Sequence, residues 1–296
     1  PLMPIIEPKQ RGIGPVGRLI IAASHRTSYQ LAKWCPRAIP CVCVLGYPRS
    51  GTVWASQMIA DYLQLPYPIL SYFPIGCPAV LHGHQLVESG GPPTVYVLRD
   101  GRDAMVSLYF YLRRAIPGRD LASAPRRLRR RFPGAVDLDD IAANLPGFIE
   151  RQCTRPTGTR HTWAEHARSV AAAGRKDVPV LRYEDLRRDC AEALAEALGV
   201  LLDEPADLDR VRESVARFSF ARQSGRQPGK EDAQAFVRKG ATGEWAEHFT
   251  REAAETFDRY CGDALIEQGY EPARSWIDRA GQSRARPTPT PAGKTS

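Results

Sequence analysis

The sequence has no long apolar run. No stretch of its 296 residues reaches the roughly 20 apolar residues that a membrane-spanning helix needs. The first residues also lack the charged start and apolar segment of a secretory signal. We therefore expect a soluble, cytoplasmic protein that does not associate with a membrane.

Cysteine is present without the spacing that would give it a structural or metal-binding role. The seven cysteines are odd in number and irregularly spaced, which argues against a disulfide framework and favours a reducing compartment. Cys41 and Cys43 alternate within an apolar run, so we expect both to point to one buried face. A metal would need further ligands close by, and the sequence offers no such cluster, so no metal site is predicted.

The sequence also lacks internal repeats, an aromatic-plus-basic RNA motif and a recognisable DNA-reading helix. Its charge is nevertheless basic, with 41 Lys and Arg against 33 Asp and Glu, a formal net charge of +8. This balance favours an anionic ligand. The arginine run at residues 126–131 is typical of a solvated helix face or loop. We expect no nucleic-acid partner, and weak, strongly salt-dependent DNA binding would favour the opposite interpretation.

The most informative stretch is residues 41–65. An apolar run (CVCVLG) predicts a buried parallel strand, YPRSGT predicts a tight turn, and the segment after it predicts a helix. On that helix, Trp54, Met58, Tyr62 and Leu65 fall on one face before Pro66 ends the pattern.

Such a strand–loop–helix unit presents unpaired N–H groups and the positive end of the helix dipole to an anion, typically phosphate. Gly46, four residues, Gly51 and Thr52 resemble a P-loop that lacks its lysine. The loop suits a single 5′-phosphate, to which Arg49 and Ser50 would add a cation and a hydroxyl. An ordinary solvated turn and a P-loop kinase remain alternatives. The kinase interpretation is weakened by the absent Gly-Lys-Ser/Thr and by the lack of an acidic, magnesium-binding strand end.

Strands alternate with helices along the chain, which predicts an α/β fold with a mostly parallel central sheet flanked by helices. Ligands of such sheets bind at the carboxyl ends of the strands. Arg49, His84, Arg99 and Tyr183 all lie at or just beyond the end of a predicted strand. The predicted strands are residues 41–46, 79–81, 94–98 and 178–183, and the predicted helices are residues 19–34, 53–65, 100–114, 141–148, 163–173, 190–202, 208–218 and 250–268.

Five motifs in order give the chain a more specific likeness. They are residues 47–54 (YPRSGTVW), 96–103 (YVLRDGRD) with Ser107, 182–186 (RYEDL), 218–220 (FSF), and 238–240 (RKG) followed by GEW. Together they resemble a cytosolic-type sulfotransferase, an enzyme that uses 3′-phosphoadenosine 5′-phosphosulfate (PAPS). The resemblance implies a sulfotransferase domain at 41–275, an N-terminal extension at 1–40 and a disordered C-terminal tail at 276–296.

The resemblance implies roles for the donor-binding residues. Residues 47–54 match the loop that holds the 5′-phosphosulfate, and Trp54 would stack on adenine unless it serves as simple core packing. Arg99 and Ser107 match a pair of residues that binds the 3′-phosphate. A second set of 3′-phosphate ligands, residues 238–240, lies on a polar loop, for which a solvated basic loop is the alternative interpretation. The cofactor-binding residues so implied are Arg49, Ser50, Gly51, Thr52, Val53, Trp54, Arg99, Ser107, Tyr183, Phe220, Arg238, Lys239 and Gly240.

Some assignments stay open. Tyr183 and Phe220 match residues that line the adenine pocket, although both could be core. Arg102 and Asp103 could equally form a local ion pair, and they are left out of the site.

His84 matches the family's catalytic histidine, with His82 as the alternative base. An imidazole titrates near neutral pH, so it can accept the acceptor hydroxyl's proton while the sulfuryl group is transferred. Arg49, where the family usually has lysine, would neutralise charge on the leaving phosphate as the second catalytic residue. The products would be a sulfated acceptor and 3′,5′-adenosine bisphosphate, with no metal required.

The acceptor itself is not readable from the sequence. We expect a small molecule that offers a hydroxyl, or less readily an amine, bound by the loops at residues 66–78 and 115–160. The family's short dimer motif is incomplete, because Ala246 and Arg251 replace its lysine and valine while Thr250 and Glu255 are present. The expected assembly is therefore a monomer or a homodimer.

Overall fold

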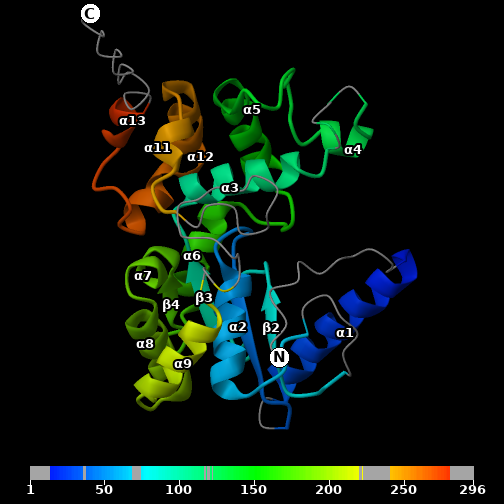
Figure 1. The fold of residues 1–296 in the computed structure, drawn as a ribbon, viewed down its shortest axis with the longest axis vertical. Coiled ribbons are helices and arrows are strands. Elements are labelled where there is room, and N and C mark those ends of the chain that lie inside the picture. Colours follow the sequence, from blue (N-terminus) through cyan, green and yellow to red (C-terminus); the bar gives the residue numbers. More distant parts are fainter. Residues whose placement is uncertain are drawn as a thin grey trace, which may run out of the picture.

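The computed structural model describes residues 14–35, 38–68, 75–116, 118, 121, 123–219, 222 and 241–280. Within these residues helices and strands alternate as the sequence predicts (Figure 1). The elements are α1 (Pro15–Trp34), β1 (Cys41–Gly46), α2 (Thr52–Leu63), β2 (Ala79–Gly83), β3 (Thr94–Leu98), α3 (Gly101–Arg113), α4 (Arg126–Arg129), α5 (Ile141–Thr154), α6 (Trp163–Ala173), β4 (Val180–Arg182), α7 (Tyr183–Arg188), α8 (Cys190–Leu202), α9 (Leu208–Arg217), α11 (Trp245–His248), α12 (Arg251–Glu267) and α13 (Trp276–Arg279).

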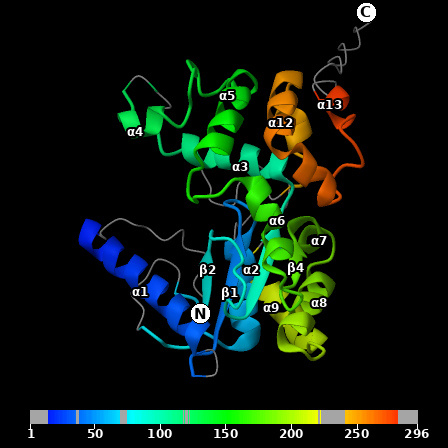
Figure 2. The same cartoon turned by 180° about the vertical axis from the view of Figure 1, so that it is seen from behind.

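The described strands form one parallel sheet in the order β2-β1-β3-β4. β1 lies in the middle, and all six of its residues are buried. Because every strand runs the same way, the carboxyl ends of all four meet at one edge of the sheet. Helices α3, α5 and α12 gather beyond the sheet in both views (Figures 1 and 2). The predicted α/β fold with a parallel sheet is confirmed.

Side-chain alternation along the strands divides the core in two. On β1, Cys41, Cys43 and Leu45 point into one cluster, which also takes in residues of α3, α5, α6 and α12. Val42 and Val44 point into the other, with residues of α2, α8 and α9. Cys41 and Cys43 therefore share a buried face, as predicted. The predicted apolar face of α2 is confirmed too, since Met58 and Tyr62 are buried in the second cluster while Trp54 and Leu65 pack against it.

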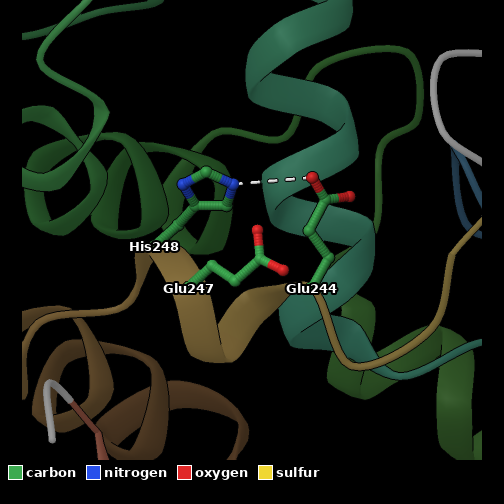
Figure 3. Close-up of side chains that lie close together, drawn as sticks. All are labelled: Glu244, Glu247 and His248. Atoms are coloured by element: carbon green, nitrogen blue, oxygen red, sulfur yellow. Dashed lines mark ion pairs between the residues drawn. The ribbon is translucent and has the colours of Figure 1, made fainter. Parts of the chain in front are cut away.

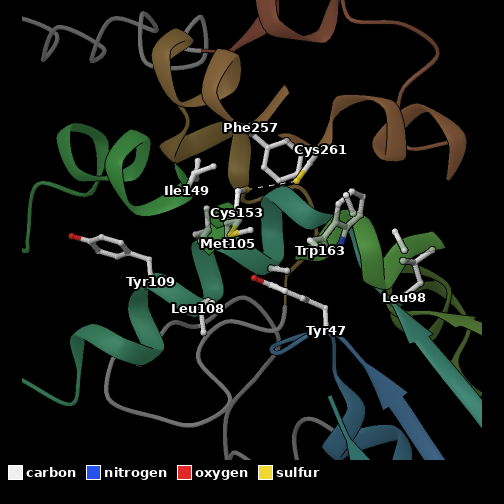
Figure 4. Close-up of a cluster of buried hydrophobic side chains, with 14 of the residues drawn as sticks. Tyr47, Leu98, Met105, Leu108, Tyr109, Ile149, Cys153, Trp163, Phe257 and Cys261 are labelled. Carbon is white, nitrogen blue, oxygen red and sulfur yellow. Dashed lines mark hydrogen bonds between the residues drawn. The ribbon is translucent and has the colours of Figure 1, made fainter. Parts of the chain in front are cut away.

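The first cluster contains most of the largest fully buried side chains of the described chain. Figure 4 shows Tyr47 pointing up from the loop after β1 toward Met105 of α3, Cys153 of α5 and Cys261 of α12. The sulfur atoms of Cys153 and Cys261 lie 3.8 Å apart, and both thiols are free. The loop at the sheet edge thus rests on a packed aromatic and sulfur-rich base, which fixes its first residue.

Several boundaries differ from those that the sequence predicts; α1, for example, begins at Pro15 and not at residue 19. Helix α5 runs six residues past the predicted end at residue 148, to Thr154, in spite of Pro146 within it. Strand β4 spans only Val180–Arg182, because Tyr183 already begins α7. The sequence places residue 276 in a tail, but Trp276 is fully buried, so the folded part continues at least through Ala280. None of the helices in the described part of the chain combines the length and apolar character needed to cross a membrane.

Candidate active site at the carboxyl edge of the sheet

The loop between β1 and α2 is built around two residues with left-handed backbone. Arg49 has φ 73° and Gly51 has φ 95°. A Cβ on Gly51 would also lie 2.7 Å from the Tyr183 ring, so only glycine fits here. Gly51 is the N-cap of α2 and offers no side chain to the helix. The first N–H groups of α2 therefore have no partner within the helix and face the loop, as an anion-binding helix end requires.

Several buried side-chain polar atoms in this region have no hydrogen-bond partner among the described residues, and two of them are on predicted phosphate-binding residues. They are the Ser50 hydroxyl, on a residue with no exposed surface, and Nε of Arg99, on a residue that is 6% exposed. A buried donor without a partner costs free energy, which a bound ligand can recover. One atom is a hydroxyl and the other carries a positive charge, so both suit the oxygen atoms of a phosphate or sulfate.

Arg49 reaches from the loop to α3. Its Nε donates to the Ser107 hydroxyl at 3.2 Å, and its guanidinium lies 4.9 Å from the centre of the Tyr111 ring. Arg114 lies over the same ring, at 4.4 Å. Burial, together with the like charges of Arg114 and Arg99, lowers the pKa of Arg49 to about 10. A bound anion would relieve the repulsion among these three cations.

Arg99 is anchored on several sides at the end of β3. Its guanidinium donates to the Arg49 carbonyl at 3.0 Å and to the Ala241 carbonyl at 3.1 Å, and it lies 4.3 Å from the centre of the Tyr183 ring. Asp103 is 3.9 Å away. Arg99 thus joins the loop after β1, the segment that begins at Ala241 and the start of α7 at one point.

His84 follows β2 directly. Its Nδ1 lies 2.7 Å from the Gly46 carbonyl, which can only accept, so Nδ1 carries the proton and Nε2 of the neutral ring is bare. Burial lowers the pKa of His84, and the positive charge of Arg49 adds to this although the bond to Gly46 opposes it. The neutral imidazole with one free lone pair is the form that a general base requires.

His82, the alternative base, lies on the same strand. Its ring centre is 5.9 Å from that of His84 and 5.8 Å from that of Tyr67. Burial and the neighbouring histidines lower the pKa of His82 to about 4. His82 contacts the Tyr67 ring instead of the loop after β1, so geometry favours His84 as the group next to the loop.

Trp54 and Tyr183, both expected near adenine, contact each other edge to face with ring centres 6.2 Å apart. The Trp54 indole N–H donates to the Phe218 carbonyl at 2.8 Å, which fixes the ring. Tyr183 is 8% exposed, lying between Gly51 and Arg99. The structure therefore brings these two aromatic side chains to the loop and to Arg99.

Four of the predicted residues, Phe220, Arg238, Lys239 and Gly240, lie outside the described residues. The chain that follows them is held to α3 by Asp103, which accepts from the N–H of Gly243 at 2.7 Å and of Trp245 at 2.9 Å. Ala241, the first described residue after these four, accepts a hydrogen bond from Arg99 through its carbonyl.

A local ion pair between Arg102 and Asp103 is not what the structure shows. Arg102 pairs with Asp100 and with Glu271, both at 2.7 Å, because the turn of α3 directs its side chain away from Asp103. The guanidinium also lies 3.8 Å from the centre of the Trp245 ring. Arg102 therefore ties α3 to the C-terminal helices and takes no part in the site.

Sequence reasoning missed Tyr111, Arg114 and Thr159. The first two could have been found, since residues 107, 111 and 114 share one face of a helix, so a ligand group on Ser107 implies neighbours at the other two. Thr159 donates to the His84 carbonyl at 2.7 Å from a segment 75 residues away, a contact that local sequence does not reveal.

A second titratable cluster lies alongside α3, between Asp103 and Phe110 of that helix. Glu244, Glu247 and His248 present ligand atoms within 4.8 Å of one another, and Figure 3 shows the three side chains on one turn. Nε2 of His248 lies 3.5 Å from a Glu244 oxygen, an ion pair when the imidazole is protonated. The ring of His248 packs on Phe110, with centres 5.5 Å apart. Among the described residues, nothing else points to a bound cation there.

Comparisons with known proteins point to one family. The sequence matches the sulfotransferase domain family over residues 87–269. It is 24% identical over 256 residues to sulfotransferase 2B1 of Rattus norvegicus, covering 73% of this chain and 68% of that protein. It is 25% identical over 264 residues to 3-alpha-hydroxysteroid sulfotransferase of Cavia porcellus, covering 76% and 83%.

Two solved structures share the fold. Mouse sulfotransferase SULT7A1 complexed with PAP has a TM-score of 0.57 at 16% identity, covering 87% of this chain and 95% of that one. Retinol dehydratase in complex with androsterone and inactive cofactor PAP has a TM-score of 0.52 at 18% identity, covering 81% and 85%. Since the family match spans more than half of its length, the chain belongs to the sulfotransferase family.

Proposed function

We propose that this enzyme transfers a sulfuryl group from PAPS to a hydroxyl of a small molecule and releases 3′,5′-adenosine bisphosphate. The observation that carries the proposal is that a possible base lies beside a cationic loop. His84 has an Nε2 without a proton, and its Nδ1 bonds to Gly46, the last residue before the loop that carries Arg49. One side of the pair suits a proton acceptor and the other a phosphosulfate. The two alternatives from sequence, a P-loop kinase and a nucleic-acid-binding module, lose their support with the family match.

The donor site would use the residues already described. Ser50, the N-terminus of α2 (Thr52, Val53) and Arg49 would hold the 5′-phosphosulfate, and the unpartnered Ser50 hydroxyl supports this. Arg99 and Ser107 would bind the 3′-phosphate, while Trp54 and Tyr183 would contact adenine. Phe220, Arg238, Lys239 and Gly240 complete the proposed site on the family resemblance alone.

In the proposed reaction, His84 Nε2 takes the proton of the acceptor hydroxyl as the acceptor oxygen bonds to sulfur and the bond from sulfur to the bridging oxygen breaks. Arg49 neutralises the charge that grows on the leaving phosphate. Such transfers have a loose transition state, so positioning and charge neutralisation carry most of the catalysis. A base of this kind contributes about 10²- to 10⁴-fold to the rate.

The proposed transfer needs no metal. Three arginines and a helix N-terminus converge on the loop, which supplies the positive charge that magnesium provides in phosphoryl transfer. Chelation with EDTA should therefore leave donor binding and turnover unchanged.

For the acceptor, we propose an alcohol on a small apolar scaffold. The support is that relatives are named for hydroxysteroids and that one structural neighbour holds androsterone and another holds retinol. His82 contacts His84, Tyr111 contacts Arg49 and Tyr67 contacts His82, so these three side chains would line the acceptor side.

Calorimetry tests the donor half of the proposal. Wild-type protein without magnesium should bind 3′,5′-adenosine bisphosphate at micromolar concentration, and Arg99→Ala should weaken binding about 10- to 100-fold, the loss expected for a buried charge-assisted contact. Arg251→Ala, which removes an exposed arginine of α12, is the matched control. Binding of ATP only with magnesium would instead favour the kinase alternative.

A further inference from the structure

His84 is held at two points, and only one of them belongs to its ring. The ring bonds to the Gly46 carbonyl, while the backbone carbonyl of His84 accepts from the Thr159 hydroxyl at 2.7 Å. His84 lies just past the end of β2, so this carbonyl falls outside the strand pairing. Thr159 thus supplies a partner that the sheet does not.

Thr159 is in turn oriented by groups around it. Its oxygen lies 3.1 Å from Nε2 of His166 and accepts from the His161 backbone N–H at 3.3 Å. The single proton of the hydroxyl points to the His84 carbonyl, so the oxygen offers a lone pair to His166. His166 must then carry its proton on Nε2 and act as a donor.

His166 is fixed in that form. It has no exposed surface, and burial with the nearby histidines lowers its pKa to about 3. Its Nδ1 has no partner among the described residues, as expected for the unprotonated nitrogen of a neutral ring. The imidazole therefore stays neutral with one defined donor at all physiological pH values.

The His166 imidazole also contacts the loop between β1 and α2, which we call the donor loop because it would hold the sulfuryl donor. The Tyr47 ring meets the His166 ring edge to face with ring centres 5.5 Å apart, and the Tyr96 ring stacks on the His166 ring with centres 6.5 Å apart. Gly158, next to Thr159, has φ 84°, and a Cβ there would lie 3.5 Å from Pro48 of the loop. The segment that holds His84 is thus packed on the loop that the donor would occupy.

We infer that Thr159 and His166 are positioning residues for the base: the chain His166 Nε2–H, Thr159 Oγ1–H, His84 carbonyl sets the place of His84 relative to the donor loop. This inference rests on the proposed function for its meaning, because His84 is a base only if the chain transfers a sulfuryl group. Neither residue touches a reacting atom. Their effect is on the reach and orientation of His84 Nε2.

The kinetic test uses substitutions that remove or keep one proton donor. Thr159→Val removes the hydroxyl with nearly the same shape, and Thr159→Ser keeps it. His166→Phe removes the donor, and His166→Gln restores an N–H. With PAPS and a panel of simple phenols and alcohols, Thr159→Val and His166→Phe should lower kcat about 10- to 100-fold, the scale expected for a catalytic group misplaced by about 1 Å. Thr159→Ser and His166→Gln should recover most of that loss.

The control variant makes the same chemical change elsewhere. Thr154→Val also removes a threonine hydroxyl bonded to a backbone carbonyl, that of Glu150, on the exposed side of α5. Its kcat should stay within twofold of wild type. For every variant, affinity for 3′,5′-adenosine bisphosphate should also stay within twofold, because the chain acts on the base and not on the phosphate contacts.

A second measurement is independent of turnover. In nitrogen-15 histidine spectra, with the His84 signal assigned through His84→Gln, wild-type His84 should show the Nδ1–H tautomer and a pKa below 6.5. Thr159→Val should move that pKa toward 6.5, as His84 loses its fixed, partly buried position, while Thr159→Ser and Thr154→Val should not.

The outcomes separate the inference from the proposed function. An unchanged His84 signal in Thr159→Val overturns the inference even if the enzyme is active. An equal loss in Thr159→Val and Thr159→Ser overturns it as well, since packing alone would then explain the effect. A shifted signal in a protein that does not bind the bisphosphate supports the hydrogen-bond chain and rejects the proposed function.

Discussion

At the scale of single residues, the neighbours of His84 decide its chemistry. The Gly46 carbonyl selects the tautomer, and burial with the Arg49 charge keeps the ring neutral near pH 7. An identical histidine on the surface would be partly protonated near its usual pKa of 6.5. The proposed base role is therefore a property of position, and it has a pH dependence that can be measured.

We expect kcat/KM to be flat above neutral pH and to fall tenfold per pH unit below a pKa that lies under 6.5, because protonated His84 cannot accept the acceptor's proton. Among the described residues, the titratable groups facing His84 are Arg49 from the loop, His82 from β2 and His166 from α6. Arg49 stays charged in this range because its pKa is about 10. A pH–rate profile checks this. A kcat/KM that keeps rising between pH 7 and 8 would argue against His84 as the base.

At the scale of elements, the site is one strand–loop–helix unit set against two neighbouring strand ends. The turn from β1 into α2 is tight because Gly46 lies against the Val97 carbonyl, with a Cβ there only 2.5 Å from that oxygen, and because Gly51 has positive φ. The backbone N–H groups of the loop can therefore point toward a bound anion while β1 and α2 remain packed against each other.

Replacing Gly51 with alanine should damage this unit more than a comparable change elsewhere. The new methyl group meets both an unfavourable φ of 95° and the Tyr183 ring, which we expect to lower stability by about 1–3 kcal/mol and to abolish nucleotide binding. Gly90→Ala is the control, since its φ is 68° but nothing lies within 4 Å of the new Cβ. Urea unfolding and calorimetry compare the two. Equal affinity in both variants would show that the loop does not hold the phosphate.

Much of this unit could be predicted from the sequence, because it is local. Apolar runs located β1 and β3, and the turn residues located the loop. Arg99 and His84 were predicted for the same edge because parallel strands end together. The bond of Thr159 to His84 and the pairing of Arg102 with Glu271 join residues far apart in sequence, so no local pattern contains them. The extension of α5 past Pro146 was missed for a related reason, since packing overrode the weak helix signal of proline.

At the scale of the whole molecule, several histidines that are fully or partly buried are kept neutral by the fold. Burial lowers the pKa of His25, His82, His84 and His166. Each of these groups binds a proton more readily in the unfolded chain than in the folded one. Their contribution to stability is therefore complete above about pH 6.5 and is lost as pH falls toward the folded pKa.

For His166, with a pKa of about 3 in the fold, the free energy of unfolding should fall by about 1.4 kcal/mol per pH unit below pH 6.5. Asp103 and Glu184, whose carboxyl pKa values burial raises, act in the opposite direction, so variants must be compared. Urea unfolding between pH 7 and pH 5 should show a steeper loss in wild type than in His166→Phe. Equal slopes would mean that His166 is protonated in the folded protein.

The central claim is that His84 acts as the base beside a PAPS-binding loop. The most direct measurement is transfer of sulfur-35 from labelled PAPS to a panel of small alcohols and phenols by wild type and His84→Gln, after both are shown to bind 3′,5′-adenosine bisphosphate. We predict transfer by the wild type and a rate at least about 100-fold lower for His84→Gln, with bisphosphate affinity unchanged within twofold. Transfer by His84→Gln at the wild-type rate would contradict the account.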